Sequence, residues 1–305
     1  MTTPPPPAAS DKQPARREHI KAIPVPHYGR WVAAVVVLAL VGLLINAFAN
    51  AKIHWSVTGD YLFDEQIIKG AVNTLKISLY SMALGLVLGV LAAIGRLSGN
   101  PVTSTVSSLY IWFFRGTPVL VQLLIWGNLA LIFPTMLGHN TNDVITPTIA
   151  ALLGLGINEG AYMAEIVRSG IQSVDEGQTE AAHALGMSKG RTLRRIVLPQ
   201  AMRVIVPPTG NEFINMLKTS SLASVVVYPE VLQKAKDVYT NNLAVMELLF
   251  AACFWYLLLT TVFSIGQYYL ERRFSRGASR ALPPTPLQRI RANLFPTRRP
   301  GAEIR

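Results

Sequence analysis

The sequence predicts an all-α fold, a polytopic bundle of helices that crosses a membrane several times. Half of the 305 residues are apolar and only 15% are charged, whereas soluble globular proteins are nearer a quarter charged. The apolar residues gather in segments of about 20, which is the length a helix needs to cross the hydrocarbon of a bilayer. Much of the net charge of +11 lies towards the two ends of the chain.

The first element is a polar tail followed by a helix. Residues 1–30 open with a run of prolines and carry five Lys or Arg against two acids, so we expect a disordered cytoplasmic tail. Residues 31–49 contain no charge and would form a helix of roughly 28 Å. Ala47–Ala49 resembles a signal-peptidase site, but the apolar stretch is too long and begins too late for a signal peptide.

Further apolar segments follow at 69–95, 107–133, 146–167, 201–224 and 243–269. Acids dominate 50–68 and 134–145, whereas Lys and Arg dominate the loops near residue 96 and at 168–200. Cytoplasmic loops are the basic ones, so the pattern predicts six helices with both termini in the cytoplasm. Residues 271–305 hold nine arginines against two acids, and we expect a basic cytoplasmic tail that can contact anionic lipid.

Glycine, cysteine and histidine residues bear on helix packing and on disulfide or metal chemistry. Gly85 and Gly89 lie four apart and would let their helix pack closely on a neighbour. Cys253 is the only cysteine, so no disulfide can form within the chain. The five histidines lack the spacing of a metal site. The phosphate-binding pattern G-x-x-x-x-G-K-[ST] is missing from the sequence, so we expect no ATP hydrolysis by this chain.

The basic loop at 175–199 reads "DEGQTEAAHALGMSKGRTLRRIVLP". We expect one short helix over 178–185 and a turn at Gly186, because glycine tolerates positive φ. Ser188 could cap a second helix, which would end before Pro199.

Ala181, Ala182 and Leu185 would share one face of the first loop helix, where small side chains allow a partner protein to approach closely. A helix-turn-helix that reads DNA is the rival interpretation. Such a domain needs a third helix and usually a dimer, and roughly 33 residues between two membrane helices leave no room for it. We therefore expect no nucleic acid among the partners.

The loop resembles a known motif. Its pattern residues are Glu180, Ala181, Ala182, Gly186, Ile196, Leu198 and Pro199. Their spacing resembles the EAA loop of bacterial ABC importer permeases. Residues 113–122, 161–171 and 207–224 are similar to segments of the polar amino-acid permeases, the histidine/glutamine-type branch. The resemblance extends over about 70–270.

The resemblance implies a type I ABC importer transmembrane domain over 69–270, with the helix at 31–49 and both tails as additions. In that family the loop docks into a groove of separate ABC ATPase subunits, which bind ATP and Mg²⁺, so no cofactor is expected on this chain. The resemblance further implies a second permease copy or a paralogue, an extracytoplasmic amino-acid-binding protein, and a multi-pass location in the plasma membrane.

Ionisable residues at bilayer depth are costly and mark function by default. Arg203 lies near a helix end and could snorkel to the interface. Glu165 lies three residues before Arg168 and could pair with it. Arg115 lies close to Pro118, which bends or breaks a helix; its guanidinium could hold helices together or bind a substrate carboxylate.

The candidate residues of a substrate pathway are Arg115, Asn158, Glu159, Asn211, Glu212 and Lys218. Carboxylates from two helices that face one cavity would suit a substrate ammonium or a cationic side chain, and residues 207–210 should loosen the helix near Glu212. We expect Glu159 to favour a basic or uncharged polar amino acid. A structural role remains open for Glu212, through an ion pair with Lys218 or Arg115.

These features predict the permease subunit of an ATP-driven importer that translocates a polar amino acid, basic or similar to glutamine and glutamate. An ion-coupled secondary carrier could instead use Glu159 and Glu212 for protons, but it would not need the EAA loop. An intramembrane serine protease is unsupported, because the predicted spans contain no histidine to act as base. We expect no catalysis by this chain.

Overall fold

The computed structural model describes residues 28–274, and the chain divides after Ile53 into two compact units. The first unit contains the helix α1, Tyr28–Ala49. Its stretch Trp31–Ala49 is long and apolar enough to cross a membrane, and none of it is buried. A helix that is apolar on all sides suits a lipid environment. The tails predicted at 1–30 and 271–305 lie almost wholly outside the described residues.

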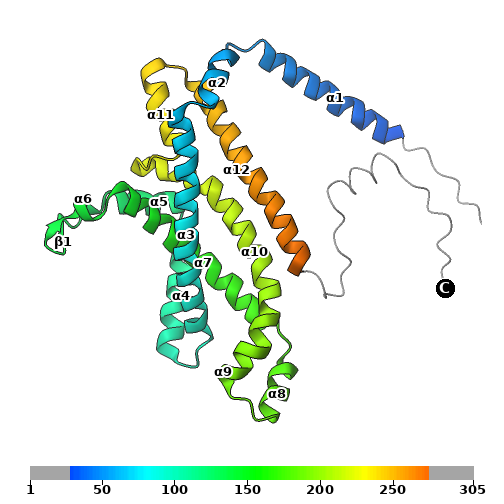
Figure 1. Cartoon of the computed structure of the whole chain (residues 1–305), viewed down its shortest axis with the longest axis vertical. Coiled ribbons are helices and arrows are strands. Elements are labelled where there is room, and N and C mark those ends of the chain that lie inside the picture. The colour runs from blue at the N-terminus through cyan, green and yellow to red at the C-terminus, as the bar shows by residue number, and fades with distance from the viewer. Residues whose placement is uncertain (1–27, 275–305) are drawn as a thin grey trace, which may run out of the picture. The chain divides into compact units, whose positions relative to one another are not determined.

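The second unit contains the remaining elements (Figure 1): α2 (Trp55–Leu62), α3 (Glu65–Leu97), α4 (Pro101–Gly116), α5 (Val119–Gly127), η1 (Leu129–Leu131), β1 (Thr135–Met136), β2 (His139–Asn140), α6 (Thr141–Val144), α7 (Pro147–Gln172), α8 (Glu176–Ala184), α9 (Lys189–Thr192), η2 (Leu193–Val197), α10 (Leu198–Thr219), η3 (Ser220–Val226), α11 (Val231–Asn242) and α12 (Val245–Phe274). The strands β1 and β2 pair antiparallel as a small hairpin. The all-α fold is confirmed.

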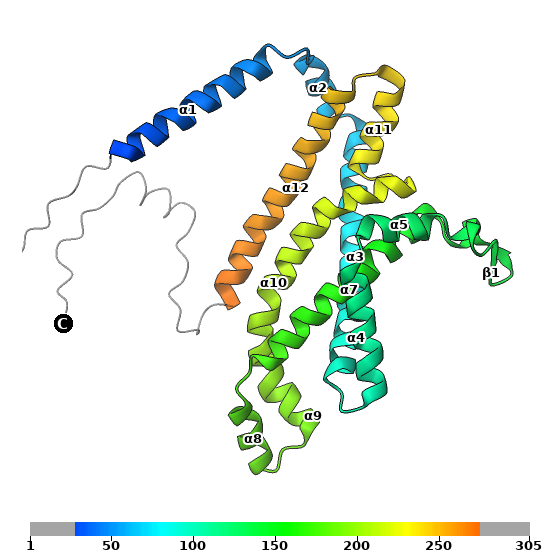
Figure 2. The ribbon, with the colours of Figure 1, turned by 180° about the vertical axis from the view of Figure 1, so that it is seen from behind.

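Within this unit α8 and α9 lie at one end, and α2 and α11 lie at the opposite end (Figures 1 and 2). The long helices α3, α7, α10 and α12 connect the two ends. The basic loop at 175–199 is therefore separated by the length of the bundle from the acidic segment before α3, as the charge pattern predicted.

The helices α3 and α7 pack against each other more extensively than any other described pair. A Cβ atom on Gly85 would lie 2.7 Å from Cγ of Glu159, and a Cβ on Gly89 would overlap that of Met163. Both glycines are thus required for the close approach, as the sequence predicted. The contact fixes the position of Glu159 on α7.

The predicted helix at 107–133 is broken into α4 and α5, which meet at an angle of 99°. Pro118 lies at the break and has no N–H to donate to the carbonyl of Phe114. That carbonyl instead accepts hydrogen bonds from Nε2 of Gln122 at 3.1 Å and Nδ2 of Asn158 at 2.8 Å. The bend expected at Pro118 is present, and α7 supplies one of the groups that stabilise it.

Among the described helices α1, α3 and α12 are long and apolar enough to span a membrane, and the bent pair of α4 and α5 is a fourth candidate. The other two predicted spans correspond to α7 and α10, which have 26 and 22 residues. They carry several charged residues, so their length and composition alone do not identify them as membrane spans. Several of these charged residues line the cavities of the second unit.

The second helix of the basic loop does not end before Pro199, contrary to the prediction. Thr192, Leu193, Val197 and Leu198 all have right-handed helical φ and ψ, so α9 continues through the π-helical turn η2 into α10. Pro199 is the second residue of α10, directly after the π-helical turn.

Two helices of eight or more residues were missing from the sequence prediction, α2 and α11, as was the four-residue α6. Residues of α2 and α11 join a core cluster with α3 and α12 that includes Ile67, Val231 and Leu248, all fully buried. The N-terminus of α11 is capped by the carboxylate of Glu230, which accepts from the backbone N–H of Leu232 and of Gln233. Both α2 and α11 lie outside the predicted spans.

Candidate functional site

A cavity of about 360 Å³, here called the central cavity, lies between α5, α7 and α10. Its lining includes Asn158, Glu159, Tyr162, Glu212, Asn215, Lys218 and Thr219. Four of the predicted pathway residues are therefore brought together: Asn158, Glu159, Glu212 and Lys218. Tyr162, Asn215 and Thr219 were not predicted. Their spacing from Glu159 and Glu212, at three and seven residues, places them on the same helix faces and could have revealed them.

Glu159 is the most deeply placed acid of the central cavity, with 6% of its surface exposed. Its Oε1 atom has no hydrogen-bond partner within residues 28–274. Glu212 is half-buried and Lys218 exposed, and neither forms an ion pair with a described residue. The pairing of Glu212 with Lys218 or Arg115, which the sequence left open, is not formed. Two carboxylates and one ammonium group thus line the same cavity.

Asn158 and Asn211 have different surroundings. The amide of Asn158 donates to the Phe114 carbonyl and, at 3.3 Å, to Oε1 of Gln122, so it also stabilises the bend at Pro118. Asn211 is exposed, and its amide lies 3.5 Å from Oε1 of Glu271 on α12. It is not among the residues of the central cavity, because successive residues on a helix point about 100° apart and its neighbour Glu212 faces that cavity.

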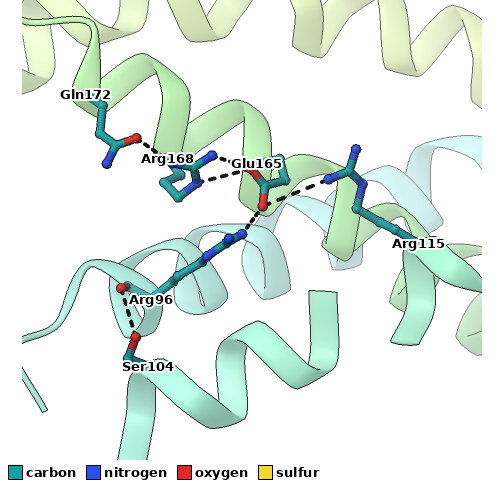
Figure 3. A network of polar contacts seen from close by, with 6 residues as sticks. All are labelled: Arg96, Ser104, Arg115, Glu165, Arg168 and Gln172. Atoms are coloured by element: carbon teal, nitrogen blue, oxygen red, sulfur yellow. Dashed lines mark hydrogen bonds and ion pairs between the residues drawn. The ribbon is translucent and has the colours of Figure 1, made fainter. Parts of the chain in front are cut away.

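Arg115 belongs to a charge cluster nearer the basic loop (Figure 3). Glu165 on α7 accepts from Nε of Arg168 at 3.1 Å and from its Nη2 at 2.7 Å, which confirms the predicted pair. Arg96 from α3 contacts Oε1 of Glu165, and Nη1 of Arg115 lies 3.9 Å from the same oxygen. The guanidinium of Arg115 also lies 5.3 Å from the ring centre of Tyr162. Three cations from three helices thus surround one carboxylate.

The basic loop has a distinct exposed face. Glu180 and Ala181 are exposed, and Leu185 is 84% exposed. Ala182 is only 2% exposed, so it faces the interior of the loop and does not share the face predicted for it. The reason is that α8 packs against α9 and η2 on that side.

Gly186 has φ of +79° and forms the turn, as expected. The side chain of Ser188 makes no capping hydrogen bond to the described chain, contrary to the prediction, although its carbonyl accepts from the N–H of Thr192 at 2.9 Å. Of the remaining pattern residues, Ile196 is half-buried in η2, and Leu198 and Pro199 are exposed at the start of α10. The pattern thus joins the turn to the first residues of α10.

No group of three or more His, Cys, Asp or Glu in the described part of the chain could hold a metal ion. What the central cavity offers is a buried carboxylate oxygen, a second carboxylate and a lysine. Such groups can bind a small molecule that carries both charges. Together with the apolar spans, they define a membrane protein that provides a polar site inside a helical bundle.

A family model makes the assignment specific. Residues 85–276 match the family described as "Binding-protein-dependent transport system inner membrane component". The match covers more than half of the chain, and the chain belongs to this family. It is a permease component of an ABC importer, and the ion-coupled carrier considered from the sequence is not supported.

Two amino-acid permeases are similar to this chain over more than two thirds of its length. The chain is 46% identical to the arginine transport system permease protein ArgU of Corynebacterium glutamicum, over 90% of this chain and 89% of that protein. It is 37% identical to the glutamine transport system permease protein GlnP of Escherichia coli, over 68% of this chain and 92% of that one.

Two solved structures of ABC transporters have a fold similar to that of this chain. The crystal structure of an amino acid ABC transporter with histidines has a TM-score of 0.66 and 33% identity, and the match covers 73% of this chain and all of that chain. An inward-facing structure of the MetNI methionine ABC transporter has a TM-score of 0.56 at 18% identity, over 68% of this chain and 96% of that chain. The second likeness concerns the fold alone.

Proposed function

We propose that this chain imports a basic amino acid, with arginine as the best candidate, and that the central cavity binds it during passage. The observation that carries the proposal is the buried carboxylate of Glu159, whose Oε1 has no partner within residues 28–274. A buried charge without a partner is costly, so a cationic substrate group that pairs with it would be bound strongly. Glu212 and Lys218 add a second acid and a group for the substrate carboxylate.

One relative supports a basic substrate. The arginine permease ArgU aligns over 90% of this chain. An alignment that leaves out only a tenth of the chain must include most of α1, which the match to the glutamine permease, at 68%, does not need to include. The relation to ArgU therefore extends beyond the family core.

The basic loop is proposed to dock onto a separate ATPase subunit through Glu180, Ala181 and Leu185, which are exposed at the end of the bundle. ATP and Mg²⁺ would bind to that subunit, and this chain would have no catalytic role. The loop and both chain termini would then face the cytoplasm of a cell with this protein in its plasma membrane. A second permease copy or paralogue and an extracytoplasmic binding protein would complete the importer.

Uptake by the complete importer in proteoliposomes, with ATP supplied on the side of the ATPase, tests the proposal. We expect Glu159→Gln to lower arginine uptake roughly tenfold, because one charge-assisted interaction is lost, while glutamine uptake relative to arginine rises. The control is Glu271→Gln, which removes a carboxylate that contacts Asn211 and Gln267 on another side of α10. Unchanged uptake and selectivity in Glu159→Gln would remove the proposed role of this residue.

A further inference from the structure

A second cavity, of about 430 Å³ and here called the arginine cavity, lies beside the central cavity. Its lining includes Arg96, Ser108, Trp112, Arg115, Tyr162 and Glu165. Tyr162 lines both cavities. The two spaces are therefore neighbours that share one aromatic side chain as part of their wall.

The arginine cavity lies between the central cavity and the basic loop. Asn158, Tyr162 and Glu165 follow one face of α7 at spacings of four and three residues. From Asn158 to Glu165 the helix advances by about 10 Å, in the direction of α8. On α4, Ser108, Trp112 and Arg115 have the same spacing and form the facing wall. A molecule that moves from the central cavity towards the loop end can pass along these faces.

The charge in the arginine cavity is unbalanced. Both oxygens of Glu165 are already engaged, one by Arg96 and the other by two nitrogens of Arg168. The side chain of Arg115 makes no hydrogen bond with any residue of 28–274 and has only the 3.9 Å approach to Glu165 and the contact with Tyr162. Its side chain is 43% exposed. A guanidinium carries five N–H donors, so the donors of Arg115 remain available to a ligand; Figure 3 shows its guanidinium directed towards Glu165.

We propose that the arginine cavity is a second binding station on the import path, where Arg115 receives the α-carboxylate of the amino acid after it leaves the central cavity. The inference rests on the proposed function for the identity of the ligand. A carboxylate fits the guanidinium because the two planar groups can form a pair of parallel hydrogen bonds. Arg96 and Arg168, which hold Glu165, leave the cluster with a net positive charge that favours an anion.

Tyr162 links the two stations. Its ring contacts Arg115 on one side and lines the central cavity on the other. A carboxylate binds the edge of a guanidinium, so Arg115 can keep the contact of its face with the ring of Tyr162 when the carboxylate is bound.

A cysteine placed in the arginine cavity tests the proposal. The chain with Cys253→Ser and Ser108→Cys, reconstituted in vesicles with its ATPase, is treated with a small maleimide in the presence of L-arginine or of its carboxamide. Both probes carry the guanidinium, and only arginine carries the carboxylate. We expect arginine to slow the modification of residue 108 at least fivefold, and the carboxamide to slow it less than twofold.

Three variants locate the effect. Arg115→Gln should abolish protection by arginine, and Arg115→Lys should restore part of it, which shows that the charge at this position is needed. The matched control is Arg203→Gln, which removes an exposed cation of α10 that lines neither cavity, so protection should remain. Equal protection in Arg115→Gln and in the unsubstituted background would overturn the proposal.

The outcomes also separate this inference from its alternatives. If phosphatidylglycerol in the vesicles protects residue 108 and arginine does not, the cavity binds a lipid headgroup and the proposal is wrong. If the complete importer fails to carry arginine, the proposed function fails. If it carries arginine while residue 108 is never protected, only the second station is refuted.

Discussion

Two buried glutamates show how surroundings separate a structural acid from one that is available to a ligand. Glu230 is fully buried, and its oxygens accept from the N–H of Leu232 at 2.9 Å, from that of Gln233 at 2.7 Å and from the hydroxyl of Tyr256. Glu159 is nearly as buried, yet one of its oxygens lacks a partner in the described chain. The first carboxylate caps a helix, and the second is left for a molecule from outside.

Glu230 makes the stability of the protein depend on pH. Burial raises the pKa of its carboxyl to about 7, against hydrogen bonds from Tyr256, Leu232 and Gln233 that lower it. Because this folded-state pKa lies above the ordinary value of 4.5, the folded state binds more protons than the unfolded state between these values. The free energy of unfolding contributed by this group therefore falls as pH rises from 4.5 to about 7 and is constant above.

We predict that Glu230→Gln removes this part of the pH dependence. The thermal midpoint of the purified protein in detergent, measured from pH 5 to 8, should decrease less steeply in the variant than in the unsubstituted protein. The difference between the two curves isolates Glu230 from the other titrating groups. Parallel curves would show that its carboxyl titrates at the same pH in the folded and unfolded states.

Single residues were predicted well where the backbone dictates the side chain. The positive φ of Gly186 and the bend at Pro118 follow from steric rules and were foreseen. Whether Asn211 faces the same cavity as Glu212 depends on helix rotation, which sequence adjacency does not reveal. The availability of Oε1 in Glu159 depends on three helices and could not be deduced from one.

At the level of elements, the basic loop shows what a turn residue contributes. Gly186 has φ of +79°, and within residues 28–274 no atom beyond its two chain neighbours lies within 4 Å of where its Cβ would be. A side chain there meets no neighbour, but a β-branched residue at positive φ is strained by roughly 1–3 kcal/mol. The strain would be relieved by changing the angle between α8 and α9.

We therefore predict that Gly186→Val leaves the permease folded in the membrane but lowers ATP-driven uptake at least tenfold. Gly190→Ala is the matched control, because it adds a methyl group in open space within α9 without positive φ. Uptake and recovery of the ATPase with the purified permease should both be measured. Normal values for both in Gly186→Val would show that the loop does not couple the two subunits.

Long apolar helices were predicted and short amphipathic ones were missed, for one physical reason. A membrane span needs about 20 apolar residues, which is a strong signal, whereas α2 and α11 have 8 and 12 residues with mixed polarity. Their helical state depends on packing against α3 and α12, through residues such as Ile67 and Leu248. The continuation of α9 into α10 was missed because Pro199 was taken as a helix end.

For the whole molecule, the division after Ile53 separates α1 from the unit that carries both cavities and the basic loop. No residue of α1 lines either cavity. The second unit has its own core clusters, built from α3, α5, α7, α10, α11 and α12. Folding of this unit should not require the first.

We predict that a chain starting at His54, with an added initiating methionine, still inserts and retains the cytoplasmic position proposed for its C-terminus, because the basic loops of the second unit set its orientation. A reporter fused to Arg305, active only in the cytoplasm, should keep at least half of its signal per inserted molecule. Loss of that signal with normal insertion would show that α1 determines the topology.

The unbroken helical path from α9 to α10 has a mechanical consequence. Pro207 and Pro208 are the prolines inside α10, and prolines and π-helical turns are the places where a helix bends. About 27 Å of helix separates Lys189 from Pro207, but only about 8 Å separates Pro207 from Glu212. If the helix tilts about these prolines, a movement of Lys189 becomes a movement about three times smaller at Glu212, with a correspondingly greater force.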